Sequence, residues 1–271
     1  MKTGHVRRLT TADTDDVLRM VELEGLDAVT LTWELTAGDD YVWVGLDSPT
    51  GGLGAVHRSM RWGDHLLLKG VFVDEPLRGS GAALELAFAL REAARHGRYA
   101  GLAAWVEPHK PEAGLAHMLR LRATGPMIHR FDVPVPEDGP VIAAPAHSTG
   151  ILAVDLPDSA RPTPLVGDLL NGDSRTAVSW VLDRHRLVLS GFPLHCVSDL
   201  HLLISAAGPL ARAQGATFME FPVPAADMSA TFTLAALKAR RLSRTPVRLG
   251  RLDFDTDRHA TDRRRKERSR A

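Results

Sequence analysis

The sequence predicts an α/β protein of the α+β type, in which a mixed central sheet is flanked by helices. Apolar runs of strand length alternate with helical patterns along the chain, and both kinds of signal occur in both halves. The 271 residues suffice for two domains of average size, and the 44% hydrophobic content is ample for packed cores. We therefore expect a globular chain with two similarly built halves.

The first elements alternate between strand and helix. Residues 5–10 predict a short strand, and Thr and Asp capping residues before an apolar face predict a helix over 10–25. The next predicted elements are a weaker helix at 31–38, strands at 41–46 and 54–62 joined by a hairpin turn, and a strand at 65–73. Gly70 interrupts this last strand, which predicts a bulge or a close backbone approach there.

The rest of the chain repeats this kind of alternation. After a long helix at 83–97, we predict a strand at 99–106, a helix at 111–125 and a strand at 127–133. Pro, Asp and Gly concentrate at 136–150, which we interpret as a linker between domains 1–135 and 151–257. Beyond it the predicted elements are strands at 176–183, 185–192, 216–223 and 246–254, and helices at 199–215 and 228–243. Their order is similar to that of 41–135, which indicates a degenerate internal duplication.

Composition and charge exclude several classes of protein. The formal net charge is zero, but residues 258–271 hold seven Arg or Lys against two acids, and we interpret them as a basic disordered tail. Nucleic acid is not an expected partner, because no aromatic platform accompanies this one basic run. No stretch has the roughly 18 apolar residues of a membrane span, so no membrane partner is expected.

Cysteine and histidine usage narrows the chemistry. The single cysteine, Cys196, excludes an internal disulfide and is most simply a small core residue. The start of the chain also lacks the apolar core of a signal peptide. Together these features favour a cytoplasmic protein. The histidines lack metal-ligand spacing, so no metal is expected. The chain is expected to be a monomer or a homodimer.

The stretch RGSGAA at 78–83, here called the glycine loop, joins a predicted strand to the start of a predicted helix. The first N–H groups of a helix have no partner within it, and the helix dipole adds positive charge there, so an anion can satisfy both. Gly79 and Gly81 leave the backbone exposed, and Arg78 can add a fork of donors. The alternative is a tight turn that uses glycine only for its backbone freedom.

The glycine loop resembles the Arg/Gln-x-x-Gly-x-Gly/Ala signature of the GNAT acyltransferase superfamily, through Arg78, Gly81 and Ala83. The order of elements over 5–135 is also similar to that family's. The resemblance implies acetyl-CoA or another acyl-CoA as cosubstrate, with its pantetheine arm along one strand and its pyrophosphate on the glycine loop. The implied binding residues are Val71, Phe72 and Val73 for pantetheine, and Arg78, Gly79, Ser80, Gly81, Ala82 and Ala83 for pyrophosphate.

The second half lacks the signature, since the corresponding stretch reads PLHCVSDLHLL. A second coenzyme site is therefore not expected. The chain resembles tandem GNAT proteins with one working half and one degenerate half. In such proteins the silent half supports the sheet and helps to shape the acceptor cleft, and we expect the same here.

The catalytic residues are harder to predict, because the family's usual glutamate and tyrosine are missing. The strand before the glycine loop offers Lys69 but no acid, and Leu121 or Arg120 stands near the tyrosine's position. Candidate acid and base groups are Glu107, His109 and His117, each of which also fits a structural role in a polar loop or on a helix. Trp33 and Glu34 are candidates for acceptor binding, because the second-helix region often lines that pocket in this family.

These observations favour an acyl-CoA-dependent N-acyltransferase that moves an acyl group, most simply acetyl, to a primary amine of a small molecule by direct attack. Two alternatives stay open. One is a non-catalytic acyl-CoA sensor, which the missing glutamate and tyrosine favour. The other is a GNAT-like acyl-CoA decarboxylase, in which a histidine such as His117 would matter.

Overall fold

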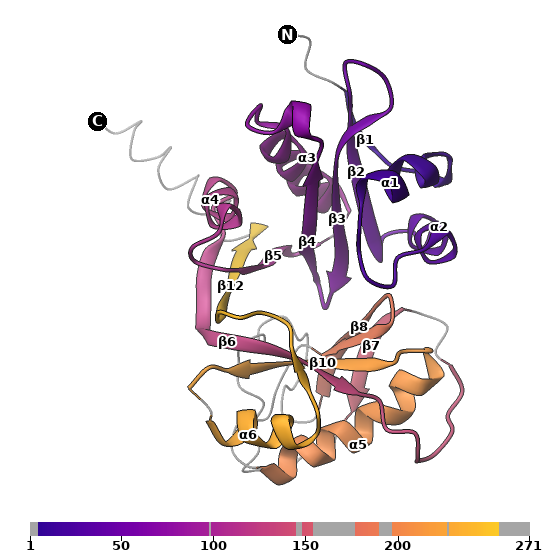
Figure 1. Ribbon diagram of the computed structural model, residues 1–271, viewed down its shortest axis with the longest axis vertical. Helices are drawn as coiled ribbons and strands as arrows, with labels where there is room; N and C mark the ends of the chain where they lie inside the picture. The colour runs from indigo at the N-terminus through magenta and orange to yellow at the C-terminus, as the bar shows by residue number, and fades with distance from the viewer. Residues whose placement is uncertain are drawn as a thin grey trace.

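A computed structural model describes residues 5–97, 99–144, 148–153, 177–189, 197–226 and 228–254 (Figure 1). The first half contains β1 (Val6–Arg8), the 3-10 helix η1 (Thr11–Asp13), α1 (Thr14–Met20), α2 (Ala28–Thr36), β2 (Tyr41–Asp47), β3 (Leu53–Trp62), β4 (His65–Val73), the 3-10 helix η2 (Glu75–Leu77), α3 (Ala82–His96), β5 (Gly101–Val106), α4 (Pro111–Met118) and β6 (Arg122–Pro134). The second half contains β7 (Thr149–Ala153), β8 (Ala177–Asp183), β9 (Arg186–Leu189), α5 (Val197–Ala213), β10 (Phe218–Pro224), α6 (Met228–Ala236), β11 (Arg240–Arg241) and β12 (Val247–Asp253).

The strands form one mixed sheet, which confirms the predicted fold class. Its order is β1-β2-β3-β4-β5-β12-β6-β10-β9-β8-β7, and β11 pairs with β6 off this path. Only β4 with β5 and β9 with β10 pair in parallel among the described strands. Each parallel pair is joined through a helix, as a parallel crossover requires.

The two halves repeat one plan. In the first half β2, β3 and β4 form an antiparallel meander, and α3 then leads to β5 beside β4. In the second half β7, β8 and β9 form a meander, and α5 leads to β10 beside β9. The internal duplication predicted from the order of elements is therefore confirmed.

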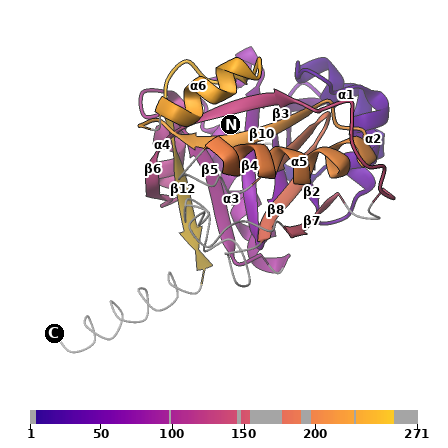
Figure 2. The ribbon, with the colours of Figure 1, turned by 90° about the horizontal axis from the view of Figure 1, so that it is seen from below.

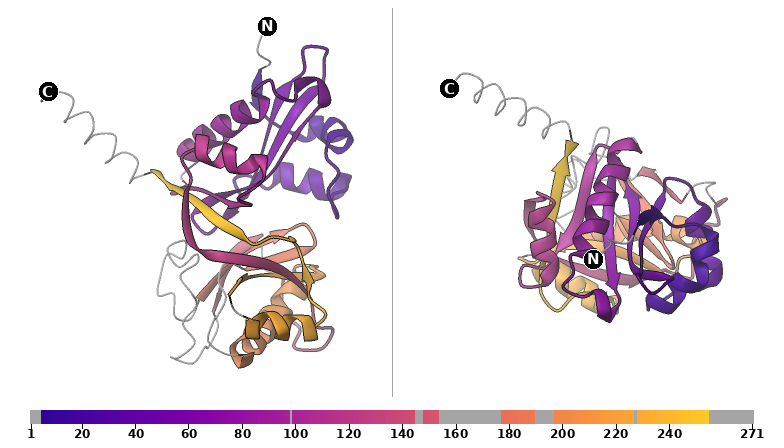
Figure 3. Two further views of the ribbon diagram at one scale, coloured as in Figure 1. Left: turned by 60° about the vertical axis from the view of Figure 1, so that its left-hand side comes forward. Right: turned by 90° about the horizontal axis from the view of Figure 1, so that it is seen from above.

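The halves also exchange their last strands (Figure 3). Strand β12 comes from the end of the second half, yet it lies between β5 and β6, with Asp253 opposite Gly101. Strand β6 ends the first half, yet its C-terminal part pairs with β10, with Pro134 opposite Phe218. Each half therefore depends on the other for the strand that completes its sheet.

Helices cover both faces of the sheet. Helix α3 packs on one face of the first half through Leu86 and Leu90. Helices α1 and α2 pack on the opposite face, and their core also contains Val181 and Val188 of the second half. Helices α5 and α6 lie over the outer face of the second half (Figure 2). The second half thus closes against the face that α1 and α2 partly cover.

Several predictions of local structure are wrong, among them the helix predicted over 10–25, which ends at Met20 because Val21 is extended. The helix predicted over 111–125 ends at Met118, because Arg120 turns the chain with a φ of 63° and β6 begins at Arg122 to pair with β12. The helix predicted over 228–243 ends at Ala236 for a similar reason, since β11 pairs with β6. Strand β7 begins inside the segment interpreted as a linker. At 111–125 and 228–243, pairing with a distant strand outweighs local helix propensity.

Several predicted features lie outside the described residues: Cys196, the other residues at 193–195 that begin the stretch replacing the signature in the second half, and the tail 258–271. In the ranges that the structure describes, no helix is both long and apolar enough to cross a membrane.

Replacing Gly101 by alanine is expected to destabilise the exchanged sheet. A Cβ on Gly101 would lie 1.9 Å from the carbonyl oxygen of Leu252, so β5 and β12 would have to separate. Overpacking of this kind costs typically 1–3 kcal/mol, which urea unfolding would measure as a lower midpoint. The matched control is Gly114→Ala on α4, where a Cβ meets nothing within 4 Å. Equal midpoints for the two variants would contradict the close packing of β12.

Candidate functional site

Strand β4 is paired along its whole length on one side but only partly on the other. On the β3 side the pairing runs from His65 to Val73. On the β5 side it stops at Leu68, opposite Ala104. Among the described strands, the edge of β4 from Lys69 to Val73 therefore has no neighbour, and an extended ligand could pair there as an added strand does.

A β-bulge lies where the two strands part. Arg58 of β3 is opposite Gly70 and Ser59 is opposite Leu68, so Lys69 is the extra residue. The bulge predicted at Gly70 is therefore confirmed, displaced by one residue. Bulges bend a strand and redirect side chains, and this one occurs at the inner end of the unpaired edge.

The glycine loop lies beyond the outer end of the same edge. Gly79 and Gly81 have φ angles of 79° and 93°, and a Cβ on either would meet nothing within 4 Å. These glycines are therefore needed for backbone conformation and not to relieve crowding. Within the described part of the chain, the N–H groups of Gly79, Gly81 and Ala83 have no hydrogen-bond acceptor, and α3 begins at Ala82. Exposed free N–H groups at a helix start suit an anion.

The remaining residues of the loop support this shape. Ser80 donates from its hydroxyl to the carbonyl of Leu77 at 2.6 Å, which holds the turn closed. The guanidinium of Arg78 is exposed and donates from Nε to the carbonyl of Val73 at 3.3 Å. Its other nitrogens stay available at the end of the unpaired β4 edge. Val71, Phe72 and Val73 are half-buried along that edge. These residues suit an elongated ligand that has an anionic end.

The three candidate acid and base groups differ in their surroundings. Glu107 follows β5 and is partly buried, and its carboxylate accepts from Thr245 and pairs with Lys110 at 2.9 Å. The hydrogen bond from Thr245 and the charge of Lys110 lower the pKa of Glu107. His109 and His117 are exposed, the latter on α4.

The two acceptor candidates on α2 face different surroundings. The Trp33 ring is 38% exposed and lies 5.2 Å from the ring of Tyr41. Glu34 is fully buried, and its carboxylate accepts from Trp43 Nε1 at 2.8 Å and from Arg58 Nε at 2.9 Å. Glu34 therefore anchors α2 on the sheet.

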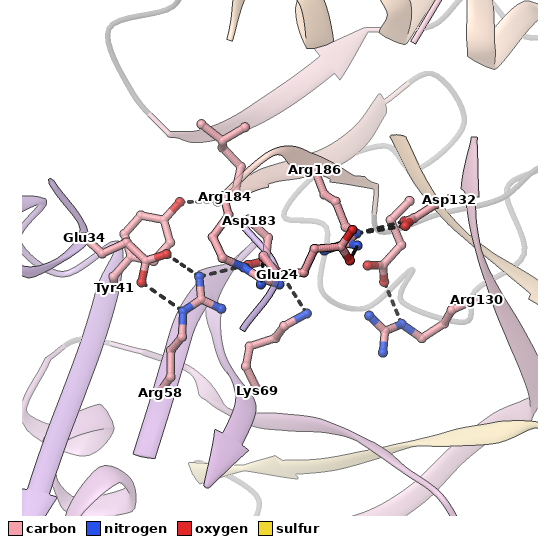
Figure 4. A network of polar contacts seen from close by, with 12 residues as sticks. Glu24, Glu34, Tyr41, Arg58, Lys69, Arg130, Asp132, Asp183, Arg184 and Arg186 are labelled. Carbon is pink, nitrogen blue, oxygen red and sulfur yellow. Dashed lines mark hydrogen bonds and ion pairs between the residues drawn. The ribbon is translucent and has the colours of Figure 1, made fainter. Parts of the chain in front are cut away.

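A polar interface cluster, formed by Glu34, Arg58, Lys69 and Asp183, joins the two halves (Figure 4). Arg58 binds Glu34 on one side, and its Nη2 lies 2.8 Å from Oδ1 of Asp183 on the other. Lys69 Nζ lies 2.9 Å from Oδ2 of Asp183. Asp183 comes from the end of β8, so the second half supplies a carboxylate to strands β3 and β4 of the first.

Burial and charge act against each other in this cluster. Burial by itself would raise the pKa of Asp183, but Arg58 and Lys69 hold it well below its ordinary value. Burial lowers the pKa of Lys69, and Asp183 compensates only in part. Removing one member of such a group leaves an uncompensated buried charge.

Further ion pairs extend the contact between the halves. Arg186 of β9 donates from Nε to Asp132 of β6 at 3.0 Å, and its Nη2 donates to Glu24 at 3.0 Å. Arg130 of β6 pairs with Glu220 of β10 at 2.6 Å. Sequence reasoning missed Arg58, Asp183 and these pairs, because isolated charges in apolar strands carry no spacing signal. Within the described ranges, no group of three His, Cys, Asp or Glu side chains is arranged to hold a metal ion.

Solved structures share this architecture. A putative acetyltransferase from Pyrococcus horikoshii matches 93% of this chain and 90% of its own, with a TM-score of 0.53 and 12% identity. A GCN5-related N-acetyltransferase from Sphaerobacter thermophilus matches 92% of this chain and 95% of its own, with a TM-score of 0.50 and 13% identity. The chain has the GNAT fold in a tandem arrangement.

A tandem GNAT protein from the clavulanic acid biosynthesis pathway is also similar, over 92% of this chain and 98% of its own, with a TM-score of 0.49 and 12% identity. No protein-family model and no curated protein sequence matches the chain. At identities of 12–13%, the likeness to the Pyrococcus and Sphaerobacter proteins shows a shared fold and does not assign a function. In this tandem GNAT fold, the first half has the parted β4 and β5 strands and the glycine loop.

Proposed function

We propose that the chain is an acyl-CoA-dependent N-acyltransferase that moves an acyl group, most simply acetyl, to the primary amine of a small molecule by direct attack. The observation that carries the proposal is the unpaired edge of β4 that leads into the glycine loop. The GNAT fold supports it, because solved proteins with this fold include N-acetyltransferases.

The residues of the first half suit an acyl-CoA in two ways. The free N–H groups of Gly79, Gly81 and Ala83 would hold the pyrophosphate, with Arg78 adding positive charge. The edge of β4 at 71–73 would pair with the amides of the pantetheine arm. The bound cosubstrate supplies the activated thioester, and the protein supplies position and proton transfer.

Glu107 is the candidate that we assign as base for the attacking amine. It follows β5, across from the unpaired part of β4, and it is less exposed than His109 or His117. Its carboxylate is ionised at neutral pH and can accept a proton, while the contacts with Thr245 and Lys110 lower its pKa and make it a weaker base than an ordinary carboxylate. Trp33, which is exposed on α2 next to Tyr41, is the corresponding proposal for contact with the acceptor.

The test combines acetyl-CoA with a panel of amino sugars, polyamines and amino acids, and detects released thiol and acylated product. Thiol release with a product heavier by one acetyl group supports the transferase. Binding of acetyl-CoA without turnover across the panel would favour the sensor. Loss of carbon dioxide from malonyl-CoA without an amine would favour the decarboxylase.

Glu107→Gln is expected to lower kcat by about 100-fold or more, because general base catalysis contributes typically 10²–10⁴-fold. Glutamine keeps an acceptor for the Thr245 hydroxyl but cannot take up a proton at neutral pH. Acetyl-CoA affinity should stay close to that of the wild type. The control is Glu112→Gln on exposed α4. A kcat equal to that of the control would remove Glu107 from the mechanism.

A further inference from the structure

Lys69 occupies the inner end of the unpaired β4 edge. It is the bulged residue, and the pairing of β4 with β5 stops at the residue before it. A ligand that starts with its anionic end at Gly81 and runs along Val73 and Val71 reaches Lys69 last. In that arrangement, the end of the ligand that is farthest from its phosphates would reach the strand position of Lys69.

The surroundings of Lys69 leave its protons available. Its side chain is 13% exposed, and Nζ lies 2.9 Å from Oδ2 of Asp183. The ammonium group carries three protons and Oδ2 of Asp183 is a single acceptor, so protons remain for a ligand. Asp183 is held in turn by Arg58, whose Nη2 lies 2.8 Å from Oδ1. Lys69 is thus oriented by a fixed carboxylate without being locked to it.

We propose that Lys69 donates the proton to the leaving thiolate of the transfer, and that Asp183 of the second half is its positioning residue. This inference rests on the proposed acyltransferase function. It also assigns the second half a direct part in the reaction. The acid is a lysine in a chain that has only two tyrosines, Tyr41 and Tyr99, neither of them on α4.

The transfer forms one bond and breaks one bond at the thioester carbonyl carbon. The amine nitrogen forms a bond to the thioester carbonyl carbon, and the C–S bond breaks with its electron pair going to sulfur. The Lys69 ammonium gives one proton to that sulfur, so coenzyme A leaves as a thiol. Glu107 takes the proton lost by the nitrogen and releases it to solvent, and solvent restores the proton of Lys69.

The charges around Lys69 make proton loss accessible. Asp183 favours its ammonium form, and Glu220 adds a weaker effect in the same direction, while Arg130 opposes them. Burial outweighs the two carboxylates, so the pKa of Lys69 is lowered. A donor whose pKa lies nearer neutrality gives up its proton more readily. An arginine at the same position would keep the charge but would not deprotonate.

The first test is Lys69→Arg. The control is Lys238→Arg, which changes an exposed lysine of the second half. We expect Lys69→Arg to fold, to bind acetyl-CoA within about threefold of the wild type, and to lose about 100-fold or more in kcat. In the wild type kcat should fall as pH rises through the pKa of Lys69, because the donor is then neutral. A merely structural ion pair would be rescued by arginine, so a kcat within threefold of the control would overturn the proposal.

The second test does not depend on turnover. The chain has five lysines, Lys2, Lys69, Lys110, Lys238 and Lys266, so lysine-labelled protein gives few NMR signals. The Lys69 signal is assigned by its loss in Lys69→Arg. Its chemical shift should change when coenzyme A is added. It should not move with adenosine 3′,5′-bisphosphate, which lacks the pantetheine arm.

The two tests separate this inference from the proposed function. If the wild type turns over but the chemical shift of Lys69 does not change with coenzyme A, the acyltransferase proposal stands and Lys69 is not the proton donor. If the chemical shift of Lys69 changes with coenzyme A but no amine is acylated, the result counts against the transferase. It would still support contact between Lys69 and the thiol end of coenzyme A. Failure of the wild type to bind coenzyme A would overturn both.

Discussion

Gly81→Glu is expected to abolish acetyl-CoA binding while the fold is kept. Gly81 has a φ of 93° at the start of α3, and a side chain there would point into open space. The glutamate would put a negative charge where the pyrophosphate is proposed to meet free N–H groups and Arg78. We expect a loss of at least about 100-fold in affinity, or about 2.8 kcal/mol, measured by calorimetric titration and by thermal shift.

The control variant has to place a glutamate at a glycine of positive φ that lies away from the glycine loop. Gly38→Glu does so, because Gly38 has a φ of 67° and a Cβ there also meets nothing within 4 Å. It lies between α2 and β2, at the other end of β2 from the glycine loop. Both variants should lose roughly 1–2 kcal/mol of stability, since a non-glycine residue is strained in this region. If Gly81→Glu still binds acetyl-CoA as well as Gly38→Glu does, the glycine loop is only a turn.

Arg58→Met is expected to destabilise the folded protein more than any other single change proposed here. Arg58 is 1% exposed and pairs with Glu34 of α2 and Asp183 of β8. Among the described residues, its removal would leave the buried Glu34 carboxylate with the Trp43 indole as its one hydrogen-bond donor. Breaking a buried pair in this way costs about 3–5 kcal/mol. We expect Tm to fall by roughly 10 °C, because each kcal/mol is worth about 2–4 °C in a chain of this size.

Two comparisons separate the stranded charge from the loss of an arginine in general. The double variant Arg58→Met with Glu34→Gln should be more stable than Arg58→Met alone, since the stranded carboxylate is gone. Arg19→Met removes an exposed arginine that pairs with Asp16 at 2.6 Å, and it should cost less than about 1 kcal/mol. If Arg58→Met unfolds at the same temperature as Arg19→Met, the polar interface cluster does not stabilise the contact between the halves.

The sequence by itself determined those parts of the protein that depend on a few neighbouring residues. The strand at 65–73, the bulge near Gly70 and the helix after the glycine loop all follow from periodicity, glycine and capping over about ten residues. The duplicated order of elements was visible for the same reason, because each element carries its own pattern. The fold class follows from that order.

Only the tertiary structure decided which residues meet. The exchange of β6 and β12, the early end of α4 at Met118 and the contact between Lys69 and Asp183 all join segments that are far apart in the chain. Local propensity carries no information on such partners, since the free energy of each contact depends on burial and charge supplied by the other segment. For this reason Glu34, a candidate for substrate contact in the sequence, is a buried partner of Arg58 in the fold, while Asp183, which no pattern singles out, lies beside the proposed proton donor.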